Sequence, residues 1–303
     1  MKNRKYFLAL TLSLLSFVLM FSCTKRSDKD EDEKPQTQEN VNSNTEIANS
    51  ENPNSETPQS ENPAAEDSNG TAAGDDSKGG SSTSPKIDET VANSDEAKEF
   101  ALDNVHNSTA TFTNLQGKEG TCMLSGFSDS YLVAAINTED YKDGLMAGAY
   151  LEVKTSKGTV NVLITSTVPP DSKKGGALCL DEQAFLKIAD KGKGIADISW
   201  KVVALPTDKP VQFKYQTGSS KSWCGIQVRN HRYPLKKLEV KLHGKYVELP
   251  REPYNYFPAK EPGLGTGPYD FRLTDIFGHV IEEKSIPLKT DGGSVSGKNN
   301  FPY

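Results

Sequence analysis

The chain has 303 residues, of which 35% are hydrophobic and 25% charged, and its formal net charge at neutral pH is −6. This length accommodates two domains of ordinary size, but the apolar fraction is too low for the whole chain to pack into cores. No excess of basic residues points to nucleic acid. We therefore expect a folded part, a disordered part and no nucleic-acid partner.

The N-terminus has the features of a bacterial secretion signal. Residues 1–5 are basic, and the apolar run from Phe7 to Phe21 is too short to cross a bilayer comfortably. Cys23 directly follows this run and a small residue, as in lipoproteins. We expect residues 1–22 to be a signal peptide and Cys23 to carry lipid, which anchors the chain to a membrane. The alternative is an ordinary secreted protein with a chance cysteine.

Residues 23–100 are predicted to form a disordered acidic linker. They are rich in Ser, Asn, Glu, Pro, Thr and Gly, and a Ser-Glu-x-Pro unit recurs every five residues between positions 50 and 63. Residues 24–98 contain 18 acidic and seven basic side chains, a net charge of −11, whereas residues 99–303 contain 23 and 25, a net charge of +2. Like-charge repulsion and prolines keep such a segment extended. The acidic cluster at 29–33 resembles signals for the outer membrane, so we expect the folded part at the cell surface.

The next region, residues 101–206, is predicted to be a small β-barrel with one helix. The helix begins at Asp181, a favourable N-cap, and continues through Phe185 and Ile188. The predicted strands are rich in β-formers and bounded by Gly, Asp, Asn or Pro; they cover residues 110–113, 131–136, 150–153, 160–165 and 198–203.

Residues 207–303 show strand patterns and no helical pattern. Strands are expected at 211–216 and 223–228, and two hairpins turn at His243–Gly244 and Phe277–Gly278. This succession predicts a β-sandwich of the immunoglobulin-like class. The short, proline-bounded segment 206–210 separates it from the barrel.

One strand carries the main candidate for binding. Alternation places Trp223, Gly225 and Gln227 on one face, and the apolar set Cys224, Ile226 and Val228 on the other, natural core face. An outward indole beside a glycine is left uncovered, which suits the apolar face of a sugar ring. The alternative is that Trp223 belongs to the core.

Several segments together resemble bacterial expansins. They include AGAYLEV at 147–153, ISWKVV at 198–203, IQVRNH at 226–231, LGTG at 264–267 and LTDI at 273–276. They occur in the family's order within residues 101–290. The resemblance implies an all-β fold, a six-stranded double-psi β-barrel followed closely by an immunoglobulin-like sandwich, with cellulose or another cell-wall polysaccharide as partner. We expect a monomer.

The resemblance also assigns candidate binding residues in the sandwich. Bacterial expansins bind cellulose through three aromatic side chains in a row, two of them adjacent. Trp223 and Tyr254 match two of these positions, and Ser222 stands where the third aromatic belongs. Tyr256 lies two residues from Tyr254, so it either replaces part of the lost surface or packs within its loop.

The barrel groove departs further from the family. Thr111 matches the groove threonine, whereas Ser166 and Val168 occupy the positions of an Asp and a Tyr. Cys179, in the segment GALCL at 176–180, occupies the position of the aspartate that expansins need for wall loosening and that related endoglucanases use as acid. Both family carboxylates are therefore absent from these positions.

Two other aspartates lie near these positions. Asp181 is better placed as the helix cap, and Asp171, in a loop, is a weak substitute for the missing acid. Glycoside hydrolysis needs a proton donor and usually a second carboxylate, so we do not expect an enzyme.

The remaining cysteines and the histidines complete the list of candidates. Cys122 and Cys179 form a disulfide across the groove or remain two separately buried thiols, and Cys224 faces the sandwich core as inert packing. The four histidines show no metal-ligand spacing, so no metal and no cofactor are expected.

These observations favour a surface-anchored expansin-like protein that binds cellulose or a related polysaccharide and loosens it without hydrolysis. Two alternatives remain open from the sequence. One is a glycosidase or peptidoglycan-cleaving enzyme with relocated acids, and the other is an adhesion lipoprotein whose barrel serves only as a rigid body.

Overall fold

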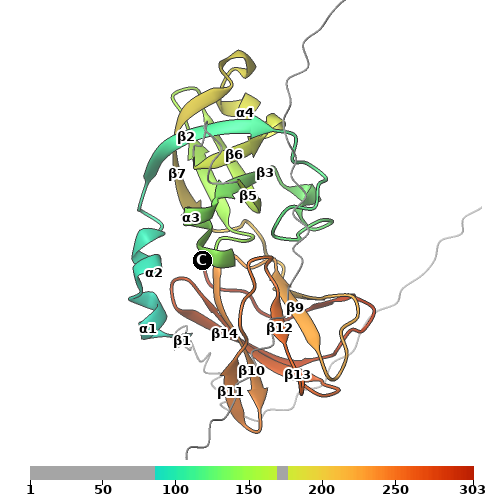
Figure 1. Cartoon of the computed structure of the whole chain (residues 1–303). Helices are drawn as coiled ribbons and strands as arrows, with labels where there is room; N and C mark the ends of the chain where they lie inside the picture. The colour runs from blue at the N-terminus through green and yellow to red at the C-terminus, as the bar shows by residue number, and fades with distance from the viewer. Residues whose placement is uncertain (1–85, 169–176) are drawn as a thin grey trace, which may run out of the picture. The chain divides into compact units, whose positions relative to one another are not determined.

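The computed structural model describes residues 86–168 and 177–303, which belong to one compact unit spanning residues 76–303. These residues form a closed β-barrel and a two-sheet sandwich, drawn above and below each other in Figure 1. The signal peptide, Cys23, the linker up to residue 85 and Asp171 lie outside the described residues. The prediction of an all-β fold with a double-psi barrel and a sandwich is confirmed.

Six strands close the barrel in the order β2-β6-β3-β5-β4-β7. Two of the pairs, β2 with β6 and β3 with β5, are parallel, and the others are antiparallel. The strands are β2 (His106–Thr113), β3 (Val133–Asn137), β4 (Tyr150–Lys154), β5 (Thr159–Val168), β6 (Leu178–Asp181) and β7 (Ile195–Val203). The sequence predicted all of these except β6.

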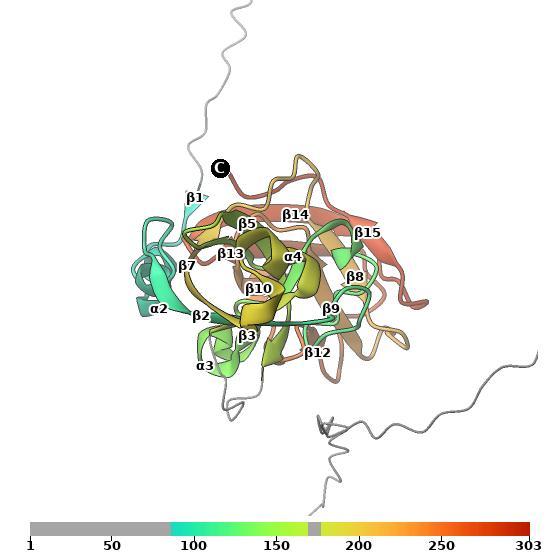
Figure 2. The same ribbon diagram turned by 90° about the horizontal axis from the view of Figure 1, so that it is seen from above.

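Short helices connect the barrel strands. The longest, α4 (Glu182–Ile188), begins after Asp181 as predicted, and its buried face packs on β2, β5 and β6 (Figure 2). The others are α3 (Thr138–Tyr141) and three 3-10 turns, η1 (Ser128–Ser130), η2 (Lys142–Gly144) and η3 (Lys191–Lys193). The core inside is apolar and includes Phe185, Trp200 and Met146.

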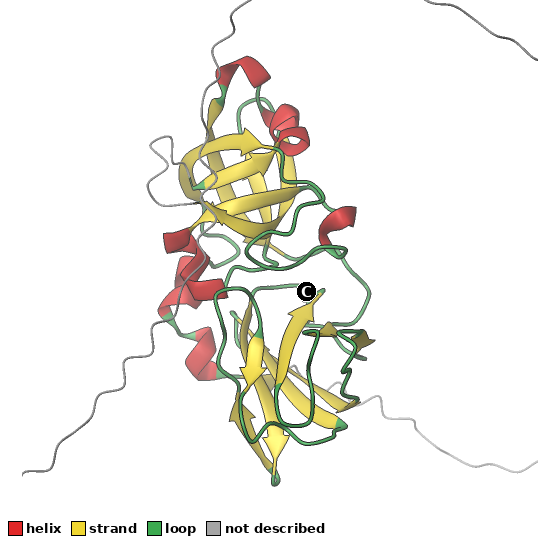
Figure 3. Ribbon diagram, turned by 45° about the vertical axis from the view of Figure 1, so that its right-hand side comes forward, coloured by secondary structure: helices red, strands yellow, loops and turns green. Residues whose placement is uncertain are grey.

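The sandwich consists of a five-stranded sheet in the order β1-β14-β13-β10-β11 and a four-stranded sheet in the order β12-β9-β8-β15 (Figure 3). Both predicted hairpins are present; His243 and Gly244, for example, both adopt positive φ, as a tight two-residue turn requires. The strands are β1 (Lys86–Ile87), β8 (Gln212–Tyr215), β9 (Cys224–Arg229), β10 (Leu235–Leu242), β11 (Lys245–Glu248), β12 (Phe257–Ala259), β13 (Tyr269–Asp275), β14 (His279–Ile286) and β15 (Ser294–Ser296).

The expectation that the linker extends to residue 100 is wrong for residues 86–100. Here β1 pairs with β14 of the sandwich, and two short helices follow, α1 (Glu89–Ala92) and α2 (Asp95–Glu99). Lys236 and Lys237 bind Glu96 and Asp88. Phe100 is fully buried and packs beside Trp200 of the barrel core, with 6.3 Å between ring centroids. This polar segment has only five apolar residues, too few to predict a folded element from the sequence: Ile87, Val91, Ala92, Ala97 and Phe100.

Candidate functional site

The side chains of β9 alternate between two environments, as predicted. Cys224, Ile226 and Val228 are buried in the core of the sandwich. The opposite side, here called the outward face, carries Trp223, which directly precedes the strand, and then Gly225, Gln227 and Arg229.

The indole of Trp223 lies outside the sandwich core and is half-buried. A Cβ built on Gly225 would lie 3.4 Å from the indole Cη2 and 2.6 Å from Gln216 Oε1, so glycine is what allows the ring and the Gln216 side chain to lie this close. A backbone hydrogen bond fixes the segment before the indole: Gly265 N–H donates to Lys221 O at 3.0 Å. The exposed Ser222 lies beside the indole in this loop.

Tyr254 and Tyr256 have different roles. Tyr254 is 36% exposed, whereas Tyr256 is only 4% exposed, although their ring centroids are 6.0 Å apart. The prediction that Tyr256 adds to the binding surface is therefore wrong. Asn255 between them has a φ of +66°, which breaks the strand alternation on which that prediction depended.

Asn255, next to Tyr254, and Gln227 of the outward face donate hydrogen bonds to the same backbone carbonyl. Cys122 O, in the barrel, accepts a hydrogen bond from Gln227 Nε2 at 3.0 Å and another from Asn255 Nδ2 at 3.4 Å. The segment that carries Tyr254 therefore runs beside the middle of the outward face.

Three of the four predicted groove residues lie in one row across neighbouring barrel strands. Thr111 of β2 pairs with Cys179 of β6, Cys179 pairs with Ala135 of β3, and Ala135 pairs with Ser166 of β5. We call Thr111, Cys179 and Ser166 the groove row. Val168 pairs with Asn137 at the end of β5, outside this row.

The groove row offers hydroxyl and thiol groups and no carboxylate. Thr111 lies next to Cys179 across the β2–β6 pair, and Ser166 Oγ lies 3.2 Å from Thr121 Oγ1. Burial raises the pKa of Cys179, so its thiol stays protonated at neutral pH. Such a set can donate and accept hydrogen bonds to a sugar chain, but it cannot serve as a paired acid and base.

Asp181 is the helix cap that the sequence predicted. One carboxylate oxygen accepts from Leu115 N and Gln116 N, both at 2.9 Å, and the other accepts from Gln183 N at 3.1 Å. The side chain is buried and fully used by these backbone donors. Asp181 therefore fixes the start of α4 and the loop that follows β2.

Of the two alternatives for Cys122 and Cys179, the disulfide is not formed, and both residues are free buried thiols. Cys122 Sγ lies 3.4 Å from the Tyr141 hydroxyl, and burial raises the pKa of Cys122 to about 12. Cys179 instead faces Thr111 in the groove row. Cys224 is also a free, buried thiol in the sandwich core.

The outward face has a second role that no sequence pattern predicted: its side chains bind the barrel. Beyond Gln227, Arg229 Nη2 donates to Met123 O at 2.9 Å. His231 is buried against Gly148 of the barrel: a Cβ built on this glycine would lie only 3.2 Å from His231 Nε2. Arg251 donates to Gly144 O. Polar side chains on a predicted strand indicate that hydrogen-bond partners are present, but they do not indicate that another domain supplies those partners.

Two kinds of feature are absent from the described residues, 86–168 and 177–303. No helix there has the length and apolar character to cross a membrane. No group of three or more His, Cys, Asp or Glu side chains is arranged there to hold a metal ion.

Comparison with known proteins places this geometry in context. No family model matches the chain. It is 35% identical to Expansin-YoaJ of Bacillus subtilis over 210 residues, which cover 67% of this chain and 89% of that protein. It is 27% identical to Expansin-like protein 5 of Dictyostelium discoideum over 192 residues, 58% of this chain and 77% of that protein.

Two solved structures have the same fold. The chain matches apo-expansin of Clavibacter michiganensis with a TM-score of 0.59 and 25% identity, over 66% of this chain and all of that one. It also matches a point mutant of that expansin in complex with cellohexaose, with a TM-score of 0.60 and 24% identity, over 66% of this chain and 99% of the mutant chain.

Proposed function

The chain belongs to the expansin family, and we propose that it binds cellulose or a related cell-wall glucan through Trp223 and Tyr254 and loosens it without hydrolysis. Expansins are non-hydrolytic, so family membership confirms the prediction that the chain is not a hydrolytic enzyme. The alternative of a glycosidase or peptidoglycan-cleaving enzyme is therefore set aside.

The observation that carries the proposal is the position of the Trp223 indole. It lies on the outside of the four-stranded sheet, half-buried against Gly225 and Gln216, on a sheet whose other face forms the core. A ring held in this way loses little conformational entropy when a sugar stacks on it. The cellohexaose complex of the Clavibacter mutant supports the same chemistry in a protein of the same fold.

Retention on microcrystalline cellulose tests the proposal. Stacking one sugar face buries ~60 Å² of apolar area at ~25 cal/mol per Å², so Trp223→Ala should weaken binding about tenfold. Tyr254→Ala should weaken it by less, because a phenol ring offers a sugar less apolar area than an indole does. Tyr246→Ala, on the other sheet, is the matched aromatic control and should bind as wild type. Equal retention of the wild type and Trp223→Ala would contradict the assignment.

Loosening is the second part of the proposal, and adhesion alone is the competing function. The groove row favours adhesion, since it carries Cys179 and Ser166 where expansins carry groove carboxylates. Extension of heat-inactivated wall strips under constant load separates the two. Loosening predicts faster creep with the wild type than with buffer, and a further increase with Cys179→Asp. Unchanged creep with retained cellulose binding would leave adhesion.

We also propose that the folded part is displayed at the bacterial cell surface by a lipid on Cys23, with the acidic segment after it as tether. The apolar run before Cys23 and the net charge of −11 over residues 24–98 support this. Metabolic labelling with a palmitate analogue tests it: wild type and Cys179→Ser should be labelled, and Cys23→Ser should not. Protease treatment of intact cells should release the folded part from wild-type cells. Labelling of Cys23→Ser, or full protection from protease, would contradict the respective step.

A further inference from the structure

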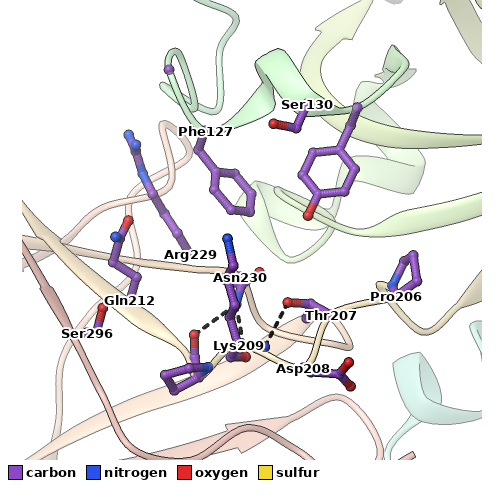
Figure 4. Close-up of a pocket in the computed structure, with 13 residues that line it drawn as sticks. Phe127, Ser130, Pro206, Thr207, Asp208, Lys209, Gln212, Arg229, Asn230 and Ser296 are labelled. Atoms are coloured by element: carbon purple, nitrogen blue, oxygen red, sulfur yellow. Dashed lines mark hydrogen bonds between the residues drawn. The ribbon is translucent and has the colours of Figure 1, made fainter. Parts of the chain in front are cut away.

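A polar cavity of about 720 Å³ lies beside the joint between the barrel and the sandwich (Figure 4). Its walls come from the barrel segment 126–131, the connecting segment 206–210 and residues of β8, β9 and β15. Neither the groove row nor Trp223 and Tyr254 line it. It is thus separate from the site described above.

The frame of the cavity is held by hydrogen bonds within the protein. Asn230, which adopts a φ of +62°, donates from Nδ2 to Lys209 O at 3.0 Å and to Pro210 O at 2.8 Å (Figure 4). Lys209 N donates to Thr207 Oγ1 at 3.2 Å. Arg229 is tied to the barrel carbonyl of Met123. The connecting segment is therefore fixed on the end of β9, and the cavity is preformed.

A second set of side chains lines the cavity with unused hydrogen-bonding groups. Within residues 86–168 and 177–303, no hydrogen bond is recorded for the side chains of Ser130, Tyr131, Asp208, Gln212 and Ser296. Strand register places Gln212 between Arg229 and Ser296. Burial raises the pKa of Tyr131, so its phenol remains a donor at neutral pH. Two hydroxyls, a phenol, an amide and a carboxylate thus line the same cavity.

Aromatic and proline rings supply the apolar part of the wall. The Phe127 and Tyr131 centroids are 5.7 Å apart with an interplanar angle of 44°, and Pro206 and Pro210 lie across the cavity. Phe127 is half-buried, and Figure 4 shows its ring pointing into the space above Asn230. A preformed cavity with aromatic walls and a few convergent polar groups is the usual form of a small-molecule site.

The balance of charges selects the class of ligand. Asp208 and Lys209 are both exposed at the cavity, so their charges offset one another, and Arg229 already donates to Ser125 O, Met123 O and Gln227 Oε1. A phosphate or another anion finds no free cluster of cations here. Hydroxyl groups beside a ring face, as in a neutral sugar, match both the free polar groups and the Phe127 ring.

We propose that this junction pocket binds a short neutral oligosaccharide, a branch or free end of the same wall glucan that Trp223 and Tyr254 bind. The choice of ligand class rests on the proposed function. Because the pocket takes walls from both domains, the ligand contacts the barrel at Phe127 and Ser130 and the sandwich at Gln212 and Ser296. Binding there strengthens the joint between the two domains.

The test uses cellotriose and the full mature chain in a Trp223→Ala/Tyr254→Ala background, which removes stacking at the other site. Amide NMR shifts on titration should localise to Gly126, Ser130, Gln212 and Asn230. Phe127→Leu keeps the packing volume but removes the aromatic face, and Gln212→Ala removes an unpaired amide; each should weaken cellotriose at least fivefold. Gln183→Ala, at an exposed position on α4, is the matched control and should change nothing.

The outcomes separate the two proposals. Cellotriose shifts at the pocket with lost cellulose retention in the double variant would support both. Two outcomes would overturn the junction pocket alone. One is normal cellulose retention by the wild type without any NMR shift at the pocket. The other is a set of pocket shifts that persists in Phe127→Leu and Gln212→Ala. Pocket shifts in a protein that is retained on no insoluble glucan would support the pocket and overturn the proposed cellulose binding.

Discussion

The two ends of the outward face of β9 have different surroundings, although strand alternation treats them alike. At one end the Trp223 indole is half-exposed beside Gly225. At the other end Gln227 and Arg229 are buried because they donate to carbonyls of the barrel segment 122–125. One row of side chains therefore provides a surface for a ligand and a joint for a domain. The IQVRNH segment carries mainly the second role.

The joint is built from side-chain donors and backbone acceptors. Within the described ranges, no carboxylate forms an ion pair with Arg229 or Arg251. Arg251 donates to Gly144 O and Leu235 O and lies over the Phe257 ring, with 4.6 Å from its Cζ to the centroid. Burial lowers the pKa of Arg251 to about 10, and it remains charged at neutral pH. The joint is therefore insensitive to the titration of acids and depends on geometry.

The largest expected effect at the joint is a dependence of stability on pH through His231. This side chain is 3% exposed; Nδ1 donates to Tyr233 O at 2.7 Å, and burial lowers its pKa to about 4, with the charge of Arg251 acting in the same direction. The unfolded chain, with an ordinary histidine pKa of ~6.5, binds more protons between these values. The free energy of unfolding should thus fall by about 3 kcal/mol as pH drops from 6.5 to 4.

Urea unfolding of wild type and His231→Gln across this pH range isolates that contribution. The variant should lose the histidine part of the slope, whereas His243→Gln, at an exposed hairpin turn, should keep it. Cellulose retention at Trp223 should be unchanged in the folded variant. Parallel pH profiles for the wild type and His231→Gln would show that the joint does not hold a neutral histidine.

A smaller effect is expected when the guanidinium is removed from the joint. Arg229→Met keeps most of the buried stem but leaves Met123 O and Ser125 O without their donor. We expect a loss of about 2 kcal/mol in the free energy of unfolding, with unchanged retention on cellulose per folded molecule. Trp223→Ala should show the opposite pattern, and Lys221→Met, at an exposed position, should change neither quantity. A loss of retention in Arg229→Met would mean that the two ends of the face act together.

The sequence predicted the fold wherever a pattern is local. Five barrel strands, the helix after Asp181 and both hairpins follow from β-formers, a cap and turn residues. Strand β6 has all four residues buried because β2 and β3 pair on its two sides, so Leu178–Asp181 shows no alternation to read. The folded segment 86–100 was missed for a similar reason: its stability comes from partners far along the chain, such as β14 and Trp200.

The candidate site divides in the same way. Alternation along one strand was enough to place Trp223 outside the core, and the cap at Asp181 follows from residue type and position. The burial of Tyr256 depends on the positive φ of Asn255, and the separate partners of Cys122 and Cys179 depend on how distant strands meet. No local sequence pattern predicts the burial of Tyr256 or the partners of the two cysteines. The contacts of Gln227 and Arg229 with the barrel belong to the same class.

The smallest effect concerns the open end of the outward face, at Ser222. This residue is exposed beside Trp223, in a loop whose backbone Gly265 holds through Lys221 O, so a larger side chain meets no core atom there. Ser222→Trp adds a second ring next to the first, and each stacked sugar face contributes ~1.5 kcal/mol at most, so retention on cellulose should rise by up to about tenfold. Immobilising the new side chain offsets part of that gain. The gain should vanish in Ser222→Trp/Trp223→Ala if the two rings share one glucan chain, because positions 222 and 223 then carry one ring between them, as in the wild type. An equal gain with and without Trp223 would mean that the new ring binds on its own and that the open end is not one continuous surface.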